Sequence, residues 1–177
     1  AAASFLFQKN FEKSESLLNN AIAASHSLKD ANDQAYRTLA MSTNNMAAAI
    51  SERTILNAHE KRLMIDLAQY ARNFWEKAGT WLQVERAEYY LSKYYRKTND
   101  FQNAEQHALL CLDICEKEKA EPLEHFFAHE ALAFIFRDKG SDVQYHRHLE
   151  QMKNYFNHCP ESDRSWMRES LAKASGR

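Results

Sequence analysis

Residues 87–111, AEYYLSKYYRKTNDFQNAEQHALLC, constrain the fold more than any other segment of the chain. Apolar residues recur every three or four positions on both sides of the short polar stretch 98–100, which is typical of two successive amphipathic helices. Small residues lie where the backbones of the two helices would have to approach closely. The segment therefore predicts a pair of packed, antiparallel helices.

The same spacing continues through the 177-residue chain, and no segment keeps the strict alternation of a β-strand. The chain has three glycines and two prolines, too few for the regular turns of a sheet protein. We expect an all-α fold, with helices near 11–28, 32–51, 56–78, 81–98, 101–118, 122–138, 142–157 and 163–174. Residues suited to helix starts support several of these boundaries: Asn99 or Asp100, Pro122, Ser141 or Asp142, and Ser162 or Asp163.

The predicted helices group into weakly similar pairs, at about 1–28, 32–78, 81–118 and 122–157, followed by a capping helix at 163–174. A repeat of about 41 to 45 residues is typical of a solenoid built from helix pairs. In the fourth pair, Tyr145 replaces the small residue of the pattern. We therefore expect that pair to be splayed or to end the regular stack.

The clearest copy resembles the tetratricopeptide repeat. Its large and small neighbours Leu91 and Ser92, the aromatic Tyr95 and Phe101, and the small Ala104 match the pattern of that family. The asparagines in Asn44-Asn45-Met46-Ala47 resemble those of repeats in kinesin light chains, and the long units resemble arrays in bacterial regulators.

This resemblance implies a right-handed α-solenoid of about eight helices, forming a single domain over residues 1–177. Because the sequence opens within the repeat pattern, a fragment of a longer array and a trimmed first helix both stay open as explanations. In such arrays the first helix of each pair lines a concave groove. The residues expected to face it are Asn44, Asn45, Arg86, Tyr89, Lys93, Arg96, Phe127, Glu130, Phe134 and Arg137.

The expected groove is basic in its middle and aromatic at one end, which suits a peptide with acidic side chains or a terminal carboxylate. We expect a non-catalytic protein-interaction module of the cytoplasm that binds a protein or peptide. A ligand-responsive regulatory domain is the first alternative, and a homodimer stays open. A net charge of −1 gives no reason to expect nucleic acid, and no apolar run is long enough for a membrane span.

An enzyme is not expected, and no cofactor is predicted, because three glycines exclude the glycine-rich nucleotide and nucleophile motifs. His125 and His129 share one helix face and form the basis of the remaining alternative, a metal-dependent enzyme. Cys111 and Cys115 are also four residues apart. We interpret them as buried core residues, since a structural zinc site uses four ligands and no second pair has matching spacing.

Overall fold

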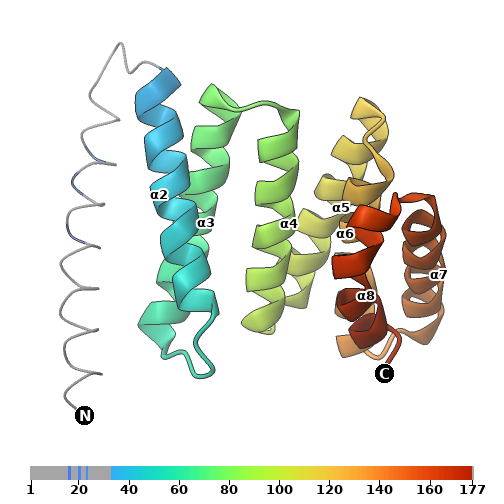
Figure 1. The fold of residues 1–177 in the computed structure, drawn as a ribbon. Helices are drawn as coiled ribbons and strands as arrows, with labels where there is room; N and C mark the ends of the chain where they lie inside the picture. The colour runs from blue at the N-terminus through green and yellow to red at the C-terminus, as the bar shows by residue number, and fades with distance from the viewer. Residues whose placement is uncertain (1–15, 17–19, 21–22, 24–32, 177) are drawn as a thin grey trace.

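The computed structural model describes residues 33–176 together with residues 16, 20 and 23 (Figure 1). The continuous part consists of α2 (Asp33–Ser51), α3 (Ala58–Ala78), α4 (Trp81–Lys97), α5 (Phe101–Glu118), α6 (Pro122–Asp138), α7 (Asp142–His158) and α8 (Glu161–Ala174). It contains no strand, so the all-α class is confirmed. None of these helices is long and apolar enough to cross a membrane. The pair predicted at 1–28 lies outside the described residues, apart from three positions.

Local capping explains where the helices begin. The Asn57 side chain accepts a hydrogen bond from the backbone N–H of Glu60, whose carboxylate accepts one from the Asn57 N–H, each at 2.9 Å. This reciprocal pair fixes the start of α3. Asp100 caps α5, as the sequence predicts, by accepting from the N–H of Asn103. The last helix was predicted to open at Ser162 or Asp163, but it begins at Glu161, because Pro160 already has the backbone angle that suits a helix entry.

Each helix packs against its neighbours in the sequence, which gives a stack of antiparallel pairs (Figure 1). Alternate helices also meet, since α4 contacts α6. The last helix, α8, lies against both α6 and α7. The first helices of the last two pairs, α4 and α6, thus lie side by side with α8, and these three helices position the candidate site.

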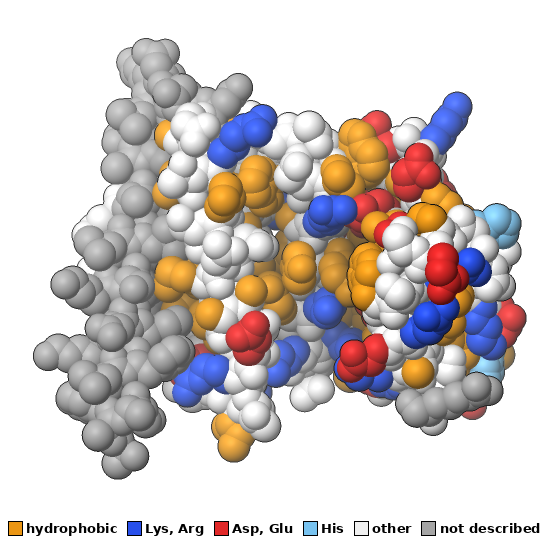
Figure 2. All heavy atoms as spheres, viewed as in Figure 1, with side chains coloured by type: hydrophobic (Ala, Val, Ile, Leu, Met, Phe, Trp, Pro, Cys, Tyr) orange, Lys and Arg blue, Asp and Glu red, His pale blue; other side chains and the backbone are white. Residues whose placement is uncertain are grey.

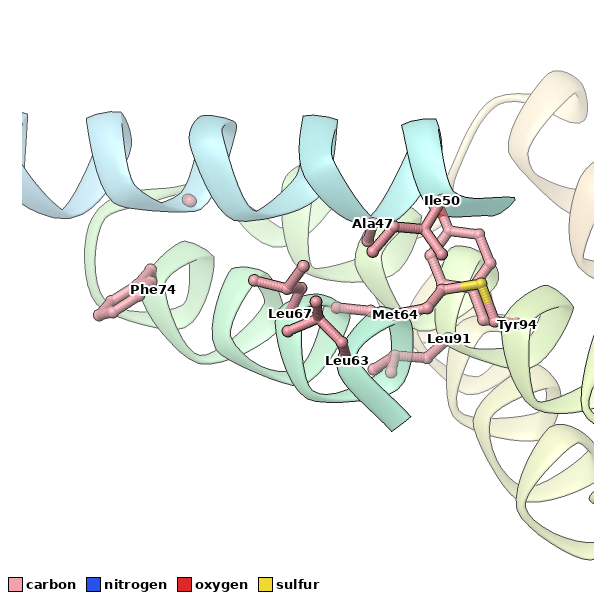
Figure 3. Close-up of a cluster of buried hydrophobic side chains, with 10 residues drawn as sticks. Ala47, Ile50, Leu63, Met64, Leu67, Phe74, Leu91 and Tyr94 are labelled. Atoms are coloured by element: carbon pink, nitrogen blue, oxygen red, sulfur yellow. The ribbon is translucent and has the colours of Figure 1, made fainter. Parts of the chain in front are cut away.

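Large side chains fill the space between α2, α3 and α4 (Figure 3). Ile50 of α2, Met64 of α3 and Leu91 of α4 are almost completely buried there, beside the small Ala47. Burying a side chain of this size stabilises the fold by about 1.5–3 kcal/mol.

Small side chains define the contact between α5 and α6. Ala104 and Ala108 of α5 are fully buried against Leu132 and Ile135 of α6. The sequence predicts that the small residues of this segment lie between the two helices of one pair; Ala104 and Ala108 pack instead in a cluster with α6, the first helix of the next pair.

Of the two outcomes expected for Tyr145, the splayed pair is not observed. Helices α6 and α7 remain in extensive contact, so the large side chain does not splay the pair. The Tyr145 hydroxyl instead donates a hydrogen bond of 2.7 Å to the backbone carbonyl of Ala174 at the end of α8. The residue therefore anchors the final helix.

Replacing Ala104 with leucine tests this packing. Ala104→Leu should force α5 away from α6 and lower the free energy of unfolding by about 1–3 kcal/mol. Thermal unfolding followed by circular dichroism measures the change. Ala49→Leu adds the same atoms at an exposed position of α2 and serves as the matched control. Equal melting temperatures for the two variants would contradict the packing described here.

Candidate functional site

A hollow of about 640 Å³ lies between three helices, with α4 on one side, α6 beneath and α8 on the other side. Its lining residues are Ser92, Lys93 and Arg96 of α4, Glu130, Ala131, Phe134, Ile135 and Arg137 of α6, and Trp166, Glu169, Ser170 and Lys173 of α8. Hydrophobic and basic side chains gather on this face (Figure 2).

A second hollow of about 420 Å³ adjoins the first and shares Lys93 and Trp166 with it. Its other lining residues are Glu85, Arg86, Tyr89, Tyr90, Leu123, Glu124 and Phe127. Because the two hollows share residues, they form one surface, which we call the α4–α6–α8 groove.

The groove brings together eight of the ten residues predicted to bind a partner, all of them from α4 and α6. The other two, Asn44 and Asn45, lie on α2, where Asn44 is half-buried and Asn45 exposed. Neither lines the groove. The asparagines belong to a different pair of helices, so the candidate site consists of the other eight residues together with α8.

Two arginines enclose one aromatic ring in the groove. The guanidinium carbons of Arg96 and Arg137 each lie 4.7 Å from the centre of the Phe134 ring. Asp138 holds both cations, since its carboxylate pairs with Arg96 at 2.7 Å and with Arg137 at 3.5 Å. Stacking and ion pairing restrict both side chains, so less entropy is lost when they bind a ligand.

Lys93 is the most available cation of the groove. Its side chain is exposed, and its ammonium nitrogen lies 4.9 Å from the centre of the Tyr89 ring. It also donates a hydrogen bond of 3.2 Å to the Tyr89 hydroxyl. No carboxylate of the described residues forms an ion pair with it. The ammonium group therefore remains accessible to an anionic partner.

Glu130 was predicted to face the groove, and it lies in the floor with an exposed fraction of 5%. One carboxylate oxygen accepts from the Tyr89 hydroxyl and the other from the Ser170 hydroxyl. Burial raises the pKa of Glu130, and the Tyr89 hydrogen bond with nearby Lys93 and Arg96 offsets only part of this effect. Glu130 therefore links α4, α6 and α8 and adds little negative charge to the surface.

Sequence reasoning missed the contribution of α8. Trp166 is 54% exposed, and its ring stacks on Phe127 with the ring centres 5.6 Å apart. Ser170 and Lys173 follow at helical spacing and line the same groove. These three residues are spaced by four and then three positions, which places them on one face of a helix. The sequence analysis interpreted α8 as a cap, so this face was not assigned to the groove.

An ion pair closes one end of the groove. Arg86 donates to the carboxylate of Glu124 at 2.7 Å, which joins α4 to α6. The Arg86 side chain is more than half exposed, whereas Glu124 is nearly buried. Arg86 therefore presents part of its guanidinium group to the second hollow.

The histidines on which the metal-enzyme alternative rests, His125 and His129, lie elsewhere, on the α6 face that packs against α7. The rings of His125 and His129 both stack on Tyr155, with ring centres 4.6 Å and 5.6 Å away. His129 Nδ1 lies 3.0 Å from His148 Nδ1, so one ring donates and the other accepts. In the described part of the chain, none of these histidines belongs to a group of three or more side chains that could hold a metal ion. Their contacts are those of a packed core.

One group of three metal-type donors does occur among the described residues. It consists of Glu85 of α4 with Cys111 and Cys115 of α5, directly behind the second hollow. The spacing of Cys111 and Cys115 was visible in the sequence, but Glu85 could not be assigned to the group because it comes from a different helix.

No protein-family model matches the chain, and no curated protein matches its sequence significantly.

The buried histidine pair should make stability depend on pH. Burial, with the neighbouring charges of His148, His125 and Arg147, lowers the pKa of His129 to about 4, against about 6.5 in an unfolded chain. Between pH 6.5 and pH 4 the unfolded state binds more protons than the folded state does. The contribution of neutral His129 to the free energy of unfolding is therefore complete above about pH 6.5, and it falls by about 1 kcal/mol per pH unit towards pH 4. Urea unfolding from pH 7 to pH 5 should show a shallower loss in His129→Gln than in wild type. His146→Gln changes an exposed histidine on α7 and should keep the wild-type slope; equal slopes in all three proteins would refute the assignment.

Proposed function

We propose that this protein is a non-catalytic recognition module that binds an extended, acidic segment of a protein partner in the α4–α6–α8 groove. The observation that carries the proposal is the meeting of cations and aromatic rings on one surface, with Lys93 the most accessible of the cations. Lys93, Arg96, Arg137 and Lys173 line the larger hollow together with Phe134 and Trp166.

The charge of the groove favours an acidic ligand. Four cations line the larger hollow against two carboxyl groups, Glu130 and Glu169, while Asp138 beside the hollow pairs with both arginines. Glu130 is buried and doubly hydrogen-bonded, and Glu169 is paired with Lys173 at 2.6 Å. A guanidinium held by stacking binds carboxylates in a fixed, two-pronged geometry. A ligand with spaced carboxylates therefore matches the side chains better than a basic one.

The shape of the groove favours an extended peptide. Its two hollows run along α4 and α6 and share Lys93 and Trp166, so a chain can cross both. Exposed tryptophan and arginine are over-represented among residues that dominate binding energy. Trp166 beside Phe127 offers a flat apolar platform at the boundary of the hollows.

A binding role also agrees with how the polar groups of the groove are used. The Ser170 and Tyr89 hydroxyls both donate to Glu130, and Arg86 is paired with Glu124. These groups hold three helices together. Packed helix pairs with buried Ser92 and Ala104 support the proposal of a tetratricopeptide-like array. Free cysteines at 111, 115 and 159 support a reducing compartment such as the cytoplasm.

Reversing the charge of Lys93 tests the choice of ligand. Lys93→Glu should weaken the binding of short acidic, tryptophan-free peptides by about tenfold or more, since it replaces an attraction with a repulsion. Fluorescence anisotropy of labelled peptides measures this, and matched peptides with lysine in place of each acidic residue should bind poorly to wild type. Lys61→Glu makes the same charge change at an exposed position outside the groove. The proposal fails if Lys93→Glu and Lys61→Glu bind the acidic peptides equally.

Removing the Trp166 ring tests the aromatic platform. Trp166→Ala should weaken binding of the same peptides by about tenfold, the loss expected of an interface anchor. In wild type, binding should also change the tryptophan fluorescence, because Trp166 is the tryptophan that lines the groove among the described residues. Trp166→Phe keeps an aromatic ring and should retain most of the affinity. Unchanged affinity in a folded Trp166→Ala protein would place the ligand elsewhere.

A further inference from the structure

Glu85, Cys111 and Cys115 form a compact cluster of metal-type donors behind the groove. The Cys111 thiol donates to a Glu85 carboxylate oxygen at 2.9 Å, and the Cys115 thiol lies 3.7 Å from the same oxygen. One donor atom from each residue lies within 4.8 Å of the other two. In a tetrahedral zinc site, Zn–S bonds of about 2.3 Å and Zn–O bonds of about 2.0 Å place neighbouring ligands roughly 3.5–3.8 Å apart. The cluster is therefore close to the dimensions that a metal ion needs.

A second observation also points to a ligand. Glu85 is 1% exposed, and its other carboxylate oxygen is buried without any hydrogen-bond partner. A buried polar atom without a partner typically destabilises a fold by about 1–3 kcal/mol, and native structures contain few of them. A buried carboxylate beside two thiols with one oxygen unused is the arrangement that a cation would complete.

We propose that Glu85, Cys111 and Cys115 bind one thiophilic metal ion of the Zn²⁺ class. Two sulfur donors and one oxygen donor suit Zn²⁺, whereas Mg²⁺ and Ca²⁺ prefer oxygen donors alone. Three protein ligands leave the fourth tetrahedral position for water or for a group of a bound partner.

The surroundings of the cluster suit such an ion. The thiols pack against the small, fully buried side chain of Ala128 on α6, and Tyr89 and Leu112 border the same cluster. Glu85 also lines the second hollow, so the cluster borders the groove. Hydrophobic walls that limit water access are a regular part of metal sites.

Metal binding must release protons from the cluster. Burial raises the pKa of Glu85 to about 7, and hydrogen bonding with Cys115 and burial raise that of Cys111. Cysteine binds a metal ion as the thiolate, so each thiol transfers its proton to solvent as its sulfur coordinates the cation. A carboxyl proton leaves as well wherever Glu85 is protonated. Affinity should therefore rise with pH.

The experiment uses reduced, chelator-treated, tag-free full chain and Cd²⁺ as the first probe. Cd²⁺ bound to thiolates has an ultraviolet charge-transfer absorption that carboxylate or histidine sites do not produce. We expect this absorption to saturate at one Cd²⁺ per chain, to be displaced by Zn²⁺, and to be accompanied by the release of about two protons or more. A wild-type protein that shows no such absorption would overturn the proposal.

Variants identify the ligands. The double variant Cys111→Ser with Cys115→Ser should lose the absorption and stoichiometric Zn²⁺, whereas Cys159→Ser, which changes a buried cysteine outside the cluster, should keep both. Zinc retained equally by the double variant would overturn the proposal.

Glu85→Gln keeps the shape of the buried side chain and protects the test against failed folding of the double variant. It should fold, as judged by circular dichroism, and bind Cd²⁺ more than about tenfold more weakly, since even supporting residues change metal affinity by 10–100-fold. Wild-type affinity in folded Glu85→Gln would overturn the proposed ligand set.

Discussion

The small side chains of α5 set the distance on which the rest of this molecule depends. Ala104, Ala108 and Cys111 are all completely buried, and none has more than one heavy atom beyond Cβ. Because α5 fits closely between its neighbours, α4 and α6 come into direct contact. That contact brings the Tyr89 hydroxyl to Glu130 and the Arg86 guanidinium to Glu124. Larger residues on α5 would separate these partners, and the groove would lose its floor.

Buried carboxyl groups then fix how the helices sit against one another. A buried charge is strongly unfavourable unless it is paired and hydrogen-bonded. Glu88 of α4 meets this condition, since Arg72 of α3 and His107 of α5 contact it at 2.8 Å and 2.6 Å. Burial raises the pKa of Glu88, but hydrogen bonds from His107 and Arg72 outweigh this effect and lower it. Glu85 differs because its nearest donors are weak thiols, which leaves one oxygen unsatisfied. Glu88 is thus fully paired, whereas Glu85, one turn away, is not, and a ligand is therefore proposed for Glu85.

The helices could be predicted from the sequence because the signals for them are local. Apolar spacing and residues such as Asp100, Pro122 and Gly140 act within a few positions of the boundaries they determine. The α4 and α6 side of the groove was also predictable, since residues off a packing stripe must share the opposite face. The pairing of Glu85 with Cys111 joins residues 26 positions apart, and that of Glu130 with Ser170 joins residues 40 apart. No local pattern encodes such contacts, which arise from the angles between helices.

The proposed metal site and the proposed peptide groove share a boundary, and this has an electrostatic consequence. Glu85 lines the hollow that Arg86 and Tyr89 also line. Where the Glu85 carboxyl group is protonated, metal binding displaces its proton together with those of the thiols, and a divalent ion bound by three anionic ligands then leaves one net negative charge on the cluster. Loading the site would therefore weaken the attraction for an acidic ligand near Arg86, and more so at low salt. Arg96 and Arg137, held around Phe134 in the larger hollow, lie apart from the cluster and should keep their preference for carboxylates. The two ends of the groove would then differ in their response to metal, with the end near Glu85 as the variable one.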